Sequence, residues 1–222
     1  SPTKAVPGWD VQVLDSENNQ VAAGEIGALS VKLPLPPGTL PTLWQNDARF
    51  LASYLEEYPG YYKTADAGFI DEEGYIYVMA RTDDIINVAG HRLSTGAMEE
   101  VLAEHPDVAE CAVVGVADAM KGQLPLGLLV LNAGVTRSAE EVVAESIQHM
   151  RDKIGPVAAF KLCAVVERLP KTRSGKILRG TMRAIADGDA WKMPATIDDP
   201  VILEEVTVAL RSLGYAGQVP RS

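Results

Sequence analysis

Residues 81–92 read Arg81-Thr-Asp-Asp-Ile-Ile-Asn-Val-Ala-Gly-His-Arg92, and they separate two stretches of different character. Before them, residues 9–14 and 27–33 have the apolar patterning of strands, and residues 68–78 predict a β-hairpin that turns at an acidic segment. A single helix is expected in this part, at residues 47–58, before Pro59-Gly60. The first stretch therefore predicts a β-rich subdomain covering residues 1–82.

Strands and helices alternate after the quoted segment. We expect strands at 108–116, 127–131 and 161–167, and helices at 94–104, 138–154, 177–186 and 199–213. Ser138-Ala-Glu-Glu141 is a capping box and marks the start of the second of these helices, at 138–154. The sequence thus predicts an α+β fold, in which a small domain at 83–190 has a mixed sheet flanked by helices and 191–222 form a helical extension.

Composition excludes several classes of protein. Hydrophobic residues make up 47% of the 222, which is typical of a globular chain, and the formal net charge of −10 argues against general nucleic-acid binding. No apolar run reaches the roughly 20 residues that span a bilayer. The two cysteines, Cys111 and Cys163, lie in apolar runs and are interpreted as reduced core thiols.

Positive charge gathers in one segment. Six of the 20 basic residues lie between Arg168 and Arg183, where there is no acidic residue. Within it, Lys171-Thr-Arg-Ser-Gly-Lys176 lies between an expected strand and an expected helix, so its Ser-Gly turn should offer free backbone N–H groups beside a helix start. The segment predicts an anion-binding loop, although a solvated basic helix face is the commoner explanation of such a charge run.

Two further motifs carry polar groups. Residues 81–92 place arginines, aspartates and a glycine at the expected domain junction, a position that suits either a ligand site or a polar linker with internal salt bridges. Tyr61-Tyr-Lys-Thr-Ala-Asp66 ends in an aspartate that can accept both hydroxyls of a ribose, and a surface turn explains it equally simply.

In their order along the chain, at 61–66, 81–92 and 170–176, the three motifs resemble the adenylate-forming enzyme superfamily, and within it the short-chain acyl-CoA synthetases of the propionyl-CoA synthetase type. The resemblance extends from about Val11 to Thr196. It implies that acetate or propionate, ATP with Mg²⁺, and coenzyme A are converted to acyl-CoA, AMP and pyrophosphate. The glycine usual before the ribose-binding aspartate is Ala65 here.

The resemblance also implies roles for single residues. Lys176 would be the catalytic lysine of adenylation and a target of lysine acetyltransferases and deacetylases, and Asp83 would be the hinge. The implied ligand-binding residues are Asp66, Arg81 and Arg92 for ATP or AMP, Ala89, Gly90 and Arg151 for CoA, and Ala103, His105 and Val108 for a cation.

The Ser/Thr/Gly-rich phosphate loop and acyl pocket of that superfamily do not occur here, so we expect Ser1 to lie inside a larger N-terminal domain and the isolated chain to be inactive. The expected compartment is the cytoplasm or the mitochondrial matrix, and no nucleic-acid or membrane partner is expected. Two alternatives stay open: a non-catalytic, detached C-terminal binding fragment, and the adenylation domain of a peptide synthetase. Because this sequence does not include the acyl pocket, it does not indicate which acyl-chain length is preferred.

Overall fold

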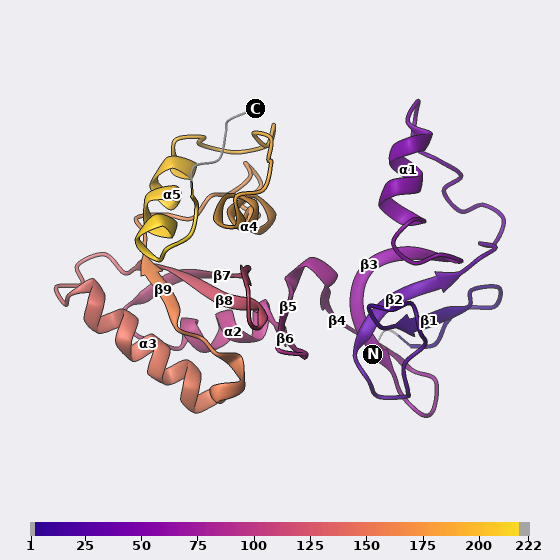
Figure 1. The fold of residues 1–222 in the computed structure, drawn as a ribbon, viewed down its shortest axis with the longest axis horizontal. Helices are drawn as coiled ribbons and strands as arrows, with labels where there is room; N and C mark the ends of the chain where they lie inside the picture. The colour runs from indigo at the N-terminus through magenta and orange to yellow at the C-terminus, as the bar shows by residue number, and fades with distance from the viewer. Residues whose placement is uncertain (1–2, 218–222) are drawn as a thin grey trace. The chain divides into compact units, whose positions relative to one another are not determined.

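The computed structural model describes residues 3–217, and the chain divides into two compact units between Asp83 and Asp84 (Figure 1). Both sheets and helices are present in the way that the α+β prediction requires, so that prediction is confirmed. None of the helices in the described range is long and apolar enough to cross a membrane.

The first unit is built on an antiparallel sheet in the order β1-β2-β3-β4. Its elements are β1 (Val11–Leu14), β2 (Gly27–Lys32), α1 (Asp47–Tyr54), β3 (Tyr61–Ile70) and β4 (Ile76–Arg81). Helix α1 begins after Asn46, whose side chain accepts a hydrogen bond from the Arg49 N–H. It ends four residues before the expected limit at 58, and its Tyr54 ring stacks on Tyr62 of β3 with centroids 5.2 Å apart. This contact holds the helix against the sheet.

The second unit is built on a mixed sheet whose path is β6-β5-β8-β7, with β9 also paired to β8. After a 3-10 turn, η1 (Thr82–Asp84), the strands are β5 (Ile85–Val88), β6 (His91–Ser94), β7 (Val108–Asp118), β8 (Gly122–Leu131) and β9 (Leu162–Val165). Strand β9 runs parallel to β8, while the other pairs are antiparallel. The expected mixed sheet is therefore present.

Helices cover both faces of this sheet (Figure 1). They are α2 (Thr95–Ala103), α3 (Ala139–Lys153), α4 (Arg179–Asp187) and α5 (Ile202–Ser212), with a 3-10 turn, η2 (Pro156–Ala158), before β9. Along β7, Val114 and Val116 enter a core shared with α4 and α5, while Cys111 and Val113 enter a core shared with α2 and α3. This alternation is the period-2 pattern of a strand buried on both faces.

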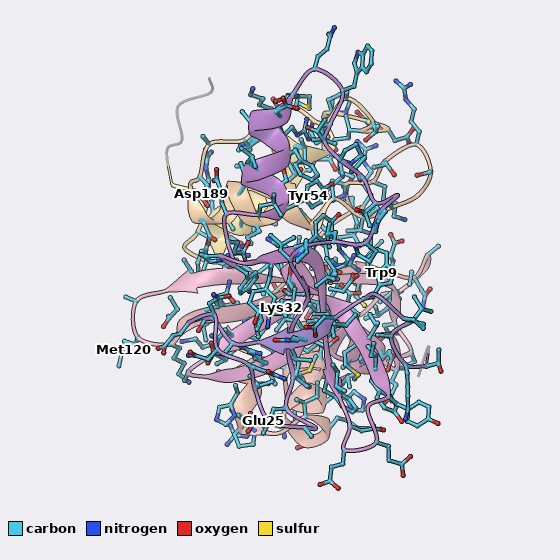
Figure 2. The ribbon with its side chains drawn as sticks, turned by 90° about the vertical axis from the view of Figure 1, so that its right-hand side faces the viewer. Trp9, Glu25, Lys32, Tyr54, Met120 and Asp189 are labelled. Carbon is cyan, nitrogen blue, oxygen red and sulfur yellow. The ribbon has the colours of Figure 1, made fainter. Side chains whose placement is uncertain are left out.

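Two elements of the second unit differ from the expectation. Strand β8 begins at Gly122 rather than at the expected 127, and Pro125 lies within the strand, opposite Gly115. The β5–β6 hairpin was not expected at all, since residues 81–92 were interpreted as a polar junction and a helix was expected from residue 94. At the turn between β7 and β8, Met120 extends into solvent with 94% of its surface exposed (Figure 2).

The expected helical extension joins the main core of the second unit. Ile197 and the apolar face of α5, which includes Ile202 and Leu210, are buried together with Met182 of α4 and Leu126 of β8. Residues 218–222 of that extension lie outside the described range. The division into 83–190 and 191–222 stays a prediction.

Candidate functional site

The lysine loop, residues 171–176, is a closed turn between β9 and α4. The Thr172 N–H donates to the Lys176 carbonyl at 2.8 Å, and the Gly175 N–H donates to the Thr172 carbonyl at 2.8 Å. Gly175 has φ +83°, a left-handed conformation that favours glycine at this position. The Lys176 N–H donates to the Thr172 hydroxyl at 3.1 Å. Two backbone N–H groups that were expected to be free for an anion are thus used inside the loop.

The loop does not lie directly at a helix terminus. Helix α4 begins at Arg179, three residues after Lys176, and its N-cap residue Leu178 makes no side-chain capping bond. A helix dipole acts mainly within the first turn, so its contribution at the Lys176 side chain is smaller than the sequence suggested. The charge of the lysine itself is the main feature of the loop.

Most of the basic segment is neutralised by acidic partners. Four of its six cations form ion pairs: Arg168 with Asp199 and Glu205, Lys171 with Glu110, Arg179 with Glu99, and Arg183 with Asp187. Within residues 3–217, no carboxylate pairs with Lys176 or Arg173, and both are exposed. The structure therefore leaves two cations of this segment available to an external anion, and both are in the lysine loop.

Glu99 holds the start of α4 against α2 and β7. Its carboxylate accepts from Arg179 Nε at 3.0 Å and Nη2 at 2.7 Å, and also from the Val113 N–H at 2.8 Å. The hydrogen bonds to Glu99 raise the pKa of the Arg179 guanidinium above its ordinary value. Sequence reasoning missed this pair, because 80 residues separate its members and neither lies in a motif.

In the first unit, Asp66 and Arg81 are opposite each other on β3 and β4. Arg81 Nη1 lies 3.4 Å from Asp66 Oδ1, and 36% of the Asp66 side chain is exposed. The preceding residue, Ala65, has φ +64° and lies at a bulge, where Leu29 pairs with Asp66 but Ser30 pairs with Lys63. The bulge explains why a glycine would suit this position, and it turns the Asp66 region out of regular pleating.

Ala89 and Gly90 form the two-residue turn of the β5–β6 hairpin. Val88 pairs with His91 across it, and φ is +49° at Ala89 and +87° at Gly90, as in a type I′ turn. Both turn residues are exposed, and an added Cβ at Gly90 would meet nothing within 4 Å. The structure places these residues at the tip of a hairpin.

Arg92 and Arg151 lie on different elements of the second unit. Arg92 is on β6 opposite Asn87, and its side chain is half-buried and engaged by other groups of the protein. Arg151 is exposed in the last turn of α3, where a cation also complements the helix dipole. The side chain of the predicted hinge, Asp83, lies outside the described part of the structure.

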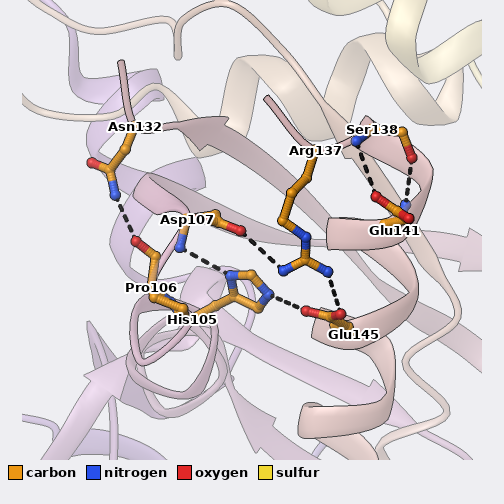
Figure 3. A network of polar contacts seen from close by, with 8 residues as sticks. All are labelled: His105, Pro106, Asp107, Asn132, Arg137, Ser138, Glu141 and Glu145. Carbon is orange, nitrogen blue, oxygen red and sulfur yellow. Dashed lines mark hydrogen bonds and ion pairs between the residues drawn. The ribbon is translucent and has the colours of Figure 1, made fainter. Parts of the chain in front are cut away.

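A polar network surrounds the residues expected to bind a cation (Figure 3). The buried His105 ring accepts from the Asp107 N–H at Nδ1, 3.1 Å, so Nε2 carries the proton donated to Glu145, also at 3.1 Å. Arg137 bridges Asp107 and Glu145, and it is the main cause of the lowered Glu145 pKa.

Both nitrogens of the His105 ring are therefore occupied, and its carbonyl already accepts from the Val108 N–H at 3.1 Å. In the described residues, no group of three or more His, Cys, Asp or Glu side chains could hold a metal ion. A cation at this position would have to use the carbonyls of Ala103, His105 and Val108, so the cation site stays a prediction.

Within each unit, only some predicted residues come together. Asp66 and Arg81 are in contact, whereas Lys176, Arg151 and the hairpin turn lie on separate elements of the second unit. A segment that sequence reasoning missed, residues 194–198, lies against the lysine loop through backbone hydrogen bonds. No side-chain pattern could have revealed such contacts.

Comparison with known proteins identifies the domain. Residues 97–176 match the AMP-binding enzyme C-terminal domain. The chain is 50% identical over 208 residues to human mitochondrial acyl-CoA synthetase short-chain family member 3, covering 94% of this chain and 30% of that protein. It is 41% identical to an acetyl-coenzyme A synthetase from Pyrobaculum arsenaticum, covering 94% and 31%.

A solved anthranilate CoA ligase in complex with anthranoyl-AMP has the same fold, with a TM-score of 0.63 and 29% identity, over 83% of this chain and 34% of the ligase. The chain spans about a third of the length of the curated relatives it matches. It therefore carries an AMP-binding enzyme C-terminal domain, and nearly all of it is homologous to acyl-CoA synthetases of the short-chain family.

Proposed function

We propose that this chain is the C-terminal part of an ATP-dependent short-chain acyl-CoA synthetase. The whole protein would convert acetate or propionate, ATP and coenzyme A to acyl-CoA, AMP and pyrophosphate. The observation that carries the proposal is the exposed Lys176 ammonium, which ends a closed loop and has no carboxylate partner within residues 3–217. Homology to acyl-CoA and acetyl-CoA synthetases supports the same reading.

In the first half-reaction, the acid would attack the α-phosphate of ATP to form acyl-AMP. Negative charge builds up on the phosphoryl oxygens in such a step, and a fixed cation at that position stabilises it. We assign this role to Lys176. A neutral or paired lysine could not supply the charge, so the lack of a carboxylate partner in the described structure is consistent with the assignment. Acetylation of Lys176 would remove the charge and stop this step.

The nucleotide would be held in part by the first unit. Asp66 has a partly exposed carboxylate that can accept both ribose hydroxyls, and Arg81 beside it can hold that carboxylate in place. Arg92 would approach the ATP phosphates, and Mg²⁺ would arrive with ATP. We place no metal on side chains of this chain, in keeping with the absence of a metal-binding cluster among the described residues.

In the second half-reaction, the CoA thiol would displace AMP after the second unit has rotated about Asp83. Ala89 and Gly90 would line the path of the pantetheine, where an exposed turn without bulky side chains can approach a thin chain closely. The exposed Arg151 would meet a CoA phosphate. We propose the cytoplasm or the mitochondrial matrix as the compartment, the latter because a relative is named as mitochondrial.

The test is an assay of the whole protein that carries this chain, with acetate, propionate and butyrate offered separately. We expect acyl-CoA and AMP to appear together, in equal amounts, only when ATP, CoA and a short acid are all present. The 222-residue chain alone serves as the control and should not exchange pyrophosphate into ATP. A whole protein that is folded but forms no AMP with any of the acids would refute the proposal in favour of a non-catalytic binding fragment.

A further inference from the structure

A short segment after α4 lies along the lysine loop; we call it the strap, residues 194–198. Thr172 and Ile197 form an isolated antiparallel bridge. The Arg173 N–H donates to the Thr196 carbonyl at 3.0 Å, and the Asp198 N–H donates to the Lys171 carbonyl at 2.9 Å. Three successive residues of the loop are thus bound to the strap through the backbone.

The other edge of the same loop residues is also occupied. Lys171 forms an antiparallel bridge with Ile177, and the Leu178 N–H donates to the Pro170 carbonyl at 2.9 Å. Residues 170–173 are therefore the middle of a small three-segment ribbon. The strap pairs with one side of it, and the segment that carries Lys176 pairs with the other. The strap and the segment that carries Lys176 are therefore two pairing steps apart, at roughly 5 Å for each step.

The strap is itself fixed to the core. Ile197 is 5% exposed and belongs to the apolar core that contains Met182 and Ile202. Just beyond the strap, Asp199 Oδ2 lies 2.6 Å from Arg168 Nη1, and Arg168 stands three residues before the loop. This ion pair thus joins the residue before the loop to the residue after the strap, while Ile197 provides the apolar anchor.

The internal bonds of the lysine loop fix its shape but not its place on the domain. They join Thr172, Gly175 and Lys176 only to one another, and α4 starts without a side-chain cap. A reacting group that is misplaced by about 1 Å can lose a hundredfold in rate. The placement of the Lys176 ammonium must come from the ribbon and from what anchors it.

We propose that the strap, through Ile197, is a positioning element that sets the place of Lys176 for the adenylation step. The proposal rests on the proposed function for its catalytic part. The strap lies beyond residues 97–176, the part that matches the known domain. The proposal therefore gives a function to the C-terminal stretch. Ile197 acts through the backbone of the loop and does not touch the substrate.

The first experiment needs no activity. Hydrogen exchange is measured on the 222-residue chain for the amides of Arg173, Gly175 and Lys176, in an Ile197→Ala variant and in Ile202→Ala. Ile202 is a matched control, because it is the same residue type in the same core and is 4% exposed. Exchange of the slow β7 and β8 amides reports the general loss of stability, against which the loop amides are compared.

We expect Ile197→Ala to speed exchange of the three loop amides at least about tenfold more than it speeds the β7 amides. Ile202→Ala should change the loop and the β7 amides alike. Equal effects of the two variants on the loop would overturn the proposal. If Ile197→Ala does not fold, Ile197→Val and Ile202→Val give the same comparison with a smaller, one-methyl perturbation.

The second experiment uses the whole protein and separates the two half-reactions. Ile197→Ala should slow pyrophosphate exchange roughly 10- to 100-fold while thioester formation from supplied acyl-AMP stays within about threefold of the unsubstituted protein. Equal losses in both half-reactions would show that Ile197 only stabilises the core and does not position Lys176. If the unsubstituted protein exchanged no pyrophosphate, the proposed function would fail, and the hydrogen-exchange result would still decide whether the strap places the loop.

Discussion

Replacing Glu99 by glutamine should loosen the second unit where α4 begins. The substitution keeps the size of the side chain, removes its charge and turns one acceptor oxygen into a donor. Glu99 accepts three hydrogen bonds at 2.7 to 3.0 Å, two from Arg179 and one from the Val113 N–H. A glutamine whose oxygen takes the place of Oε1 can keep the bonds from the Val113 N–H and Arg179 Nε, but its NH₂ group would then face Arg179 Nη2.

The magnitude follows from burial and from the number of bonds. A hydrogen bond to a charged group contributes about 1.5–3 kcal/mol, and breaking a fully buried ion pair costs about 3–5 kcal/mol. The two side chains are 16% and 26% exposed, so the pair is mostly but not fully shielded from water. We therefore expect Glu99→Gln to lower the free energy of unfolding of this unit by about 2 kcal/mol. Glu99→Ala should lower it by about 3 kcal/mol, because the Val113 N–H also loses its acceptor.

The matched control is Glu100→Gln, which makes the same chemical change one residue later on α2, where the side chain is exposed. It should change the stability by less than about 0.5 kcal/mol. Because the chain has two units, one unfolding free energy for the whole chain is not well defined, and hydrogen exchange of the slowest β7 and β8 amides is the suitable assay. Equal effects of the two substitutions would refute the reasoning about the Glu99–Arg179 pair.

Three further predictions concern thiols, pH and backbone strain. Burial raises the pKa of Cys163 to about 12 and that of Cys111 to about 11, so iodoacetamide at about pH 8 should label neither in the native chain and both after denaturation, as counted by mass spectrometry. Hydrogen bonds from Arg137, and to a smaller extent from His105, hold the pKa of Glu145 below its ordinary value. The ionised Glu145 therefore stabilises the fold at a pH above the ordinary carboxyl pKa, and this stabilisation is lost as the pH falls through the lower pKa of the folded state. Urea unfolding between about pH 5 and about pH 3 should show this loss, and Glu145→Gln should make the dependence shallower; an unchanged slope would contradict the assignment. Ala89 has φ +49° at the first position of a type I′ turn, a conformation that asparagine tolerates better than alanine. Ala89→Asn should therefore stabilise the second unit by about 0.5–1 kcal/mol, as measured by hydrogen exchange. A decrease in stability would show that Ala89 is not strained.

Local signals in the sequence predicted the elements that depend on neighbouring residues. The capping box at Ser138 and Glu141 is present with both of its hydrogen bonds, and α3 runs from Ala139 to Lys153 close to the expected limits. The helical periodicity at 199–213 corresponds to α5. In both cases the residues that give the sequence signal and the hydrogen bonds of the helix lie within a few positions of each other.

Other features depend on partners that are distant in the chain. Glu99 and Arg179 are 80 residues apart, and the strap binds the lysine loop through backbone groups that every residue possesses. The basic segment was visible as a run of cations, but it is neutralised by five acidic residues from other parts of the chain. Sequence reasoning could therefore find Lys176 but could not show that it is one of the two cations left over.

The expectation of free N–H groups in the lysine loop was wrong for a related reason. A Ser-Gly turn can offer its N–H groups to an anion or use them to close itself, and the choice depends on the Thr172 carbonyl and hydroxyl. The sequence shows that Thr172 is present, but it does not show that its carbonyl and hydroxyl face the N–H groups of the loop. The anion-directed character of the loop thus rests on the ammonium of Lys176 more than on backbone donors.

The most direct test of the central claim compares Lys176→Ala with Arg173→Ala in the whole protein. These are the two exposed cations of the loop without carboxylate partners in the described structure, so the pair separates a specific role from general positive charge. Lys176→Ala should slow pyrophosphate exchange by about 100-fold or more and leave thioester formation from supplied acyl-AMP within about threefold, while Arg173→Ala should change the first rate far less. Equal losses in both half-reactions, or equal effects of the two substitutions, would contradict the assignment of Lys176 to adenylation.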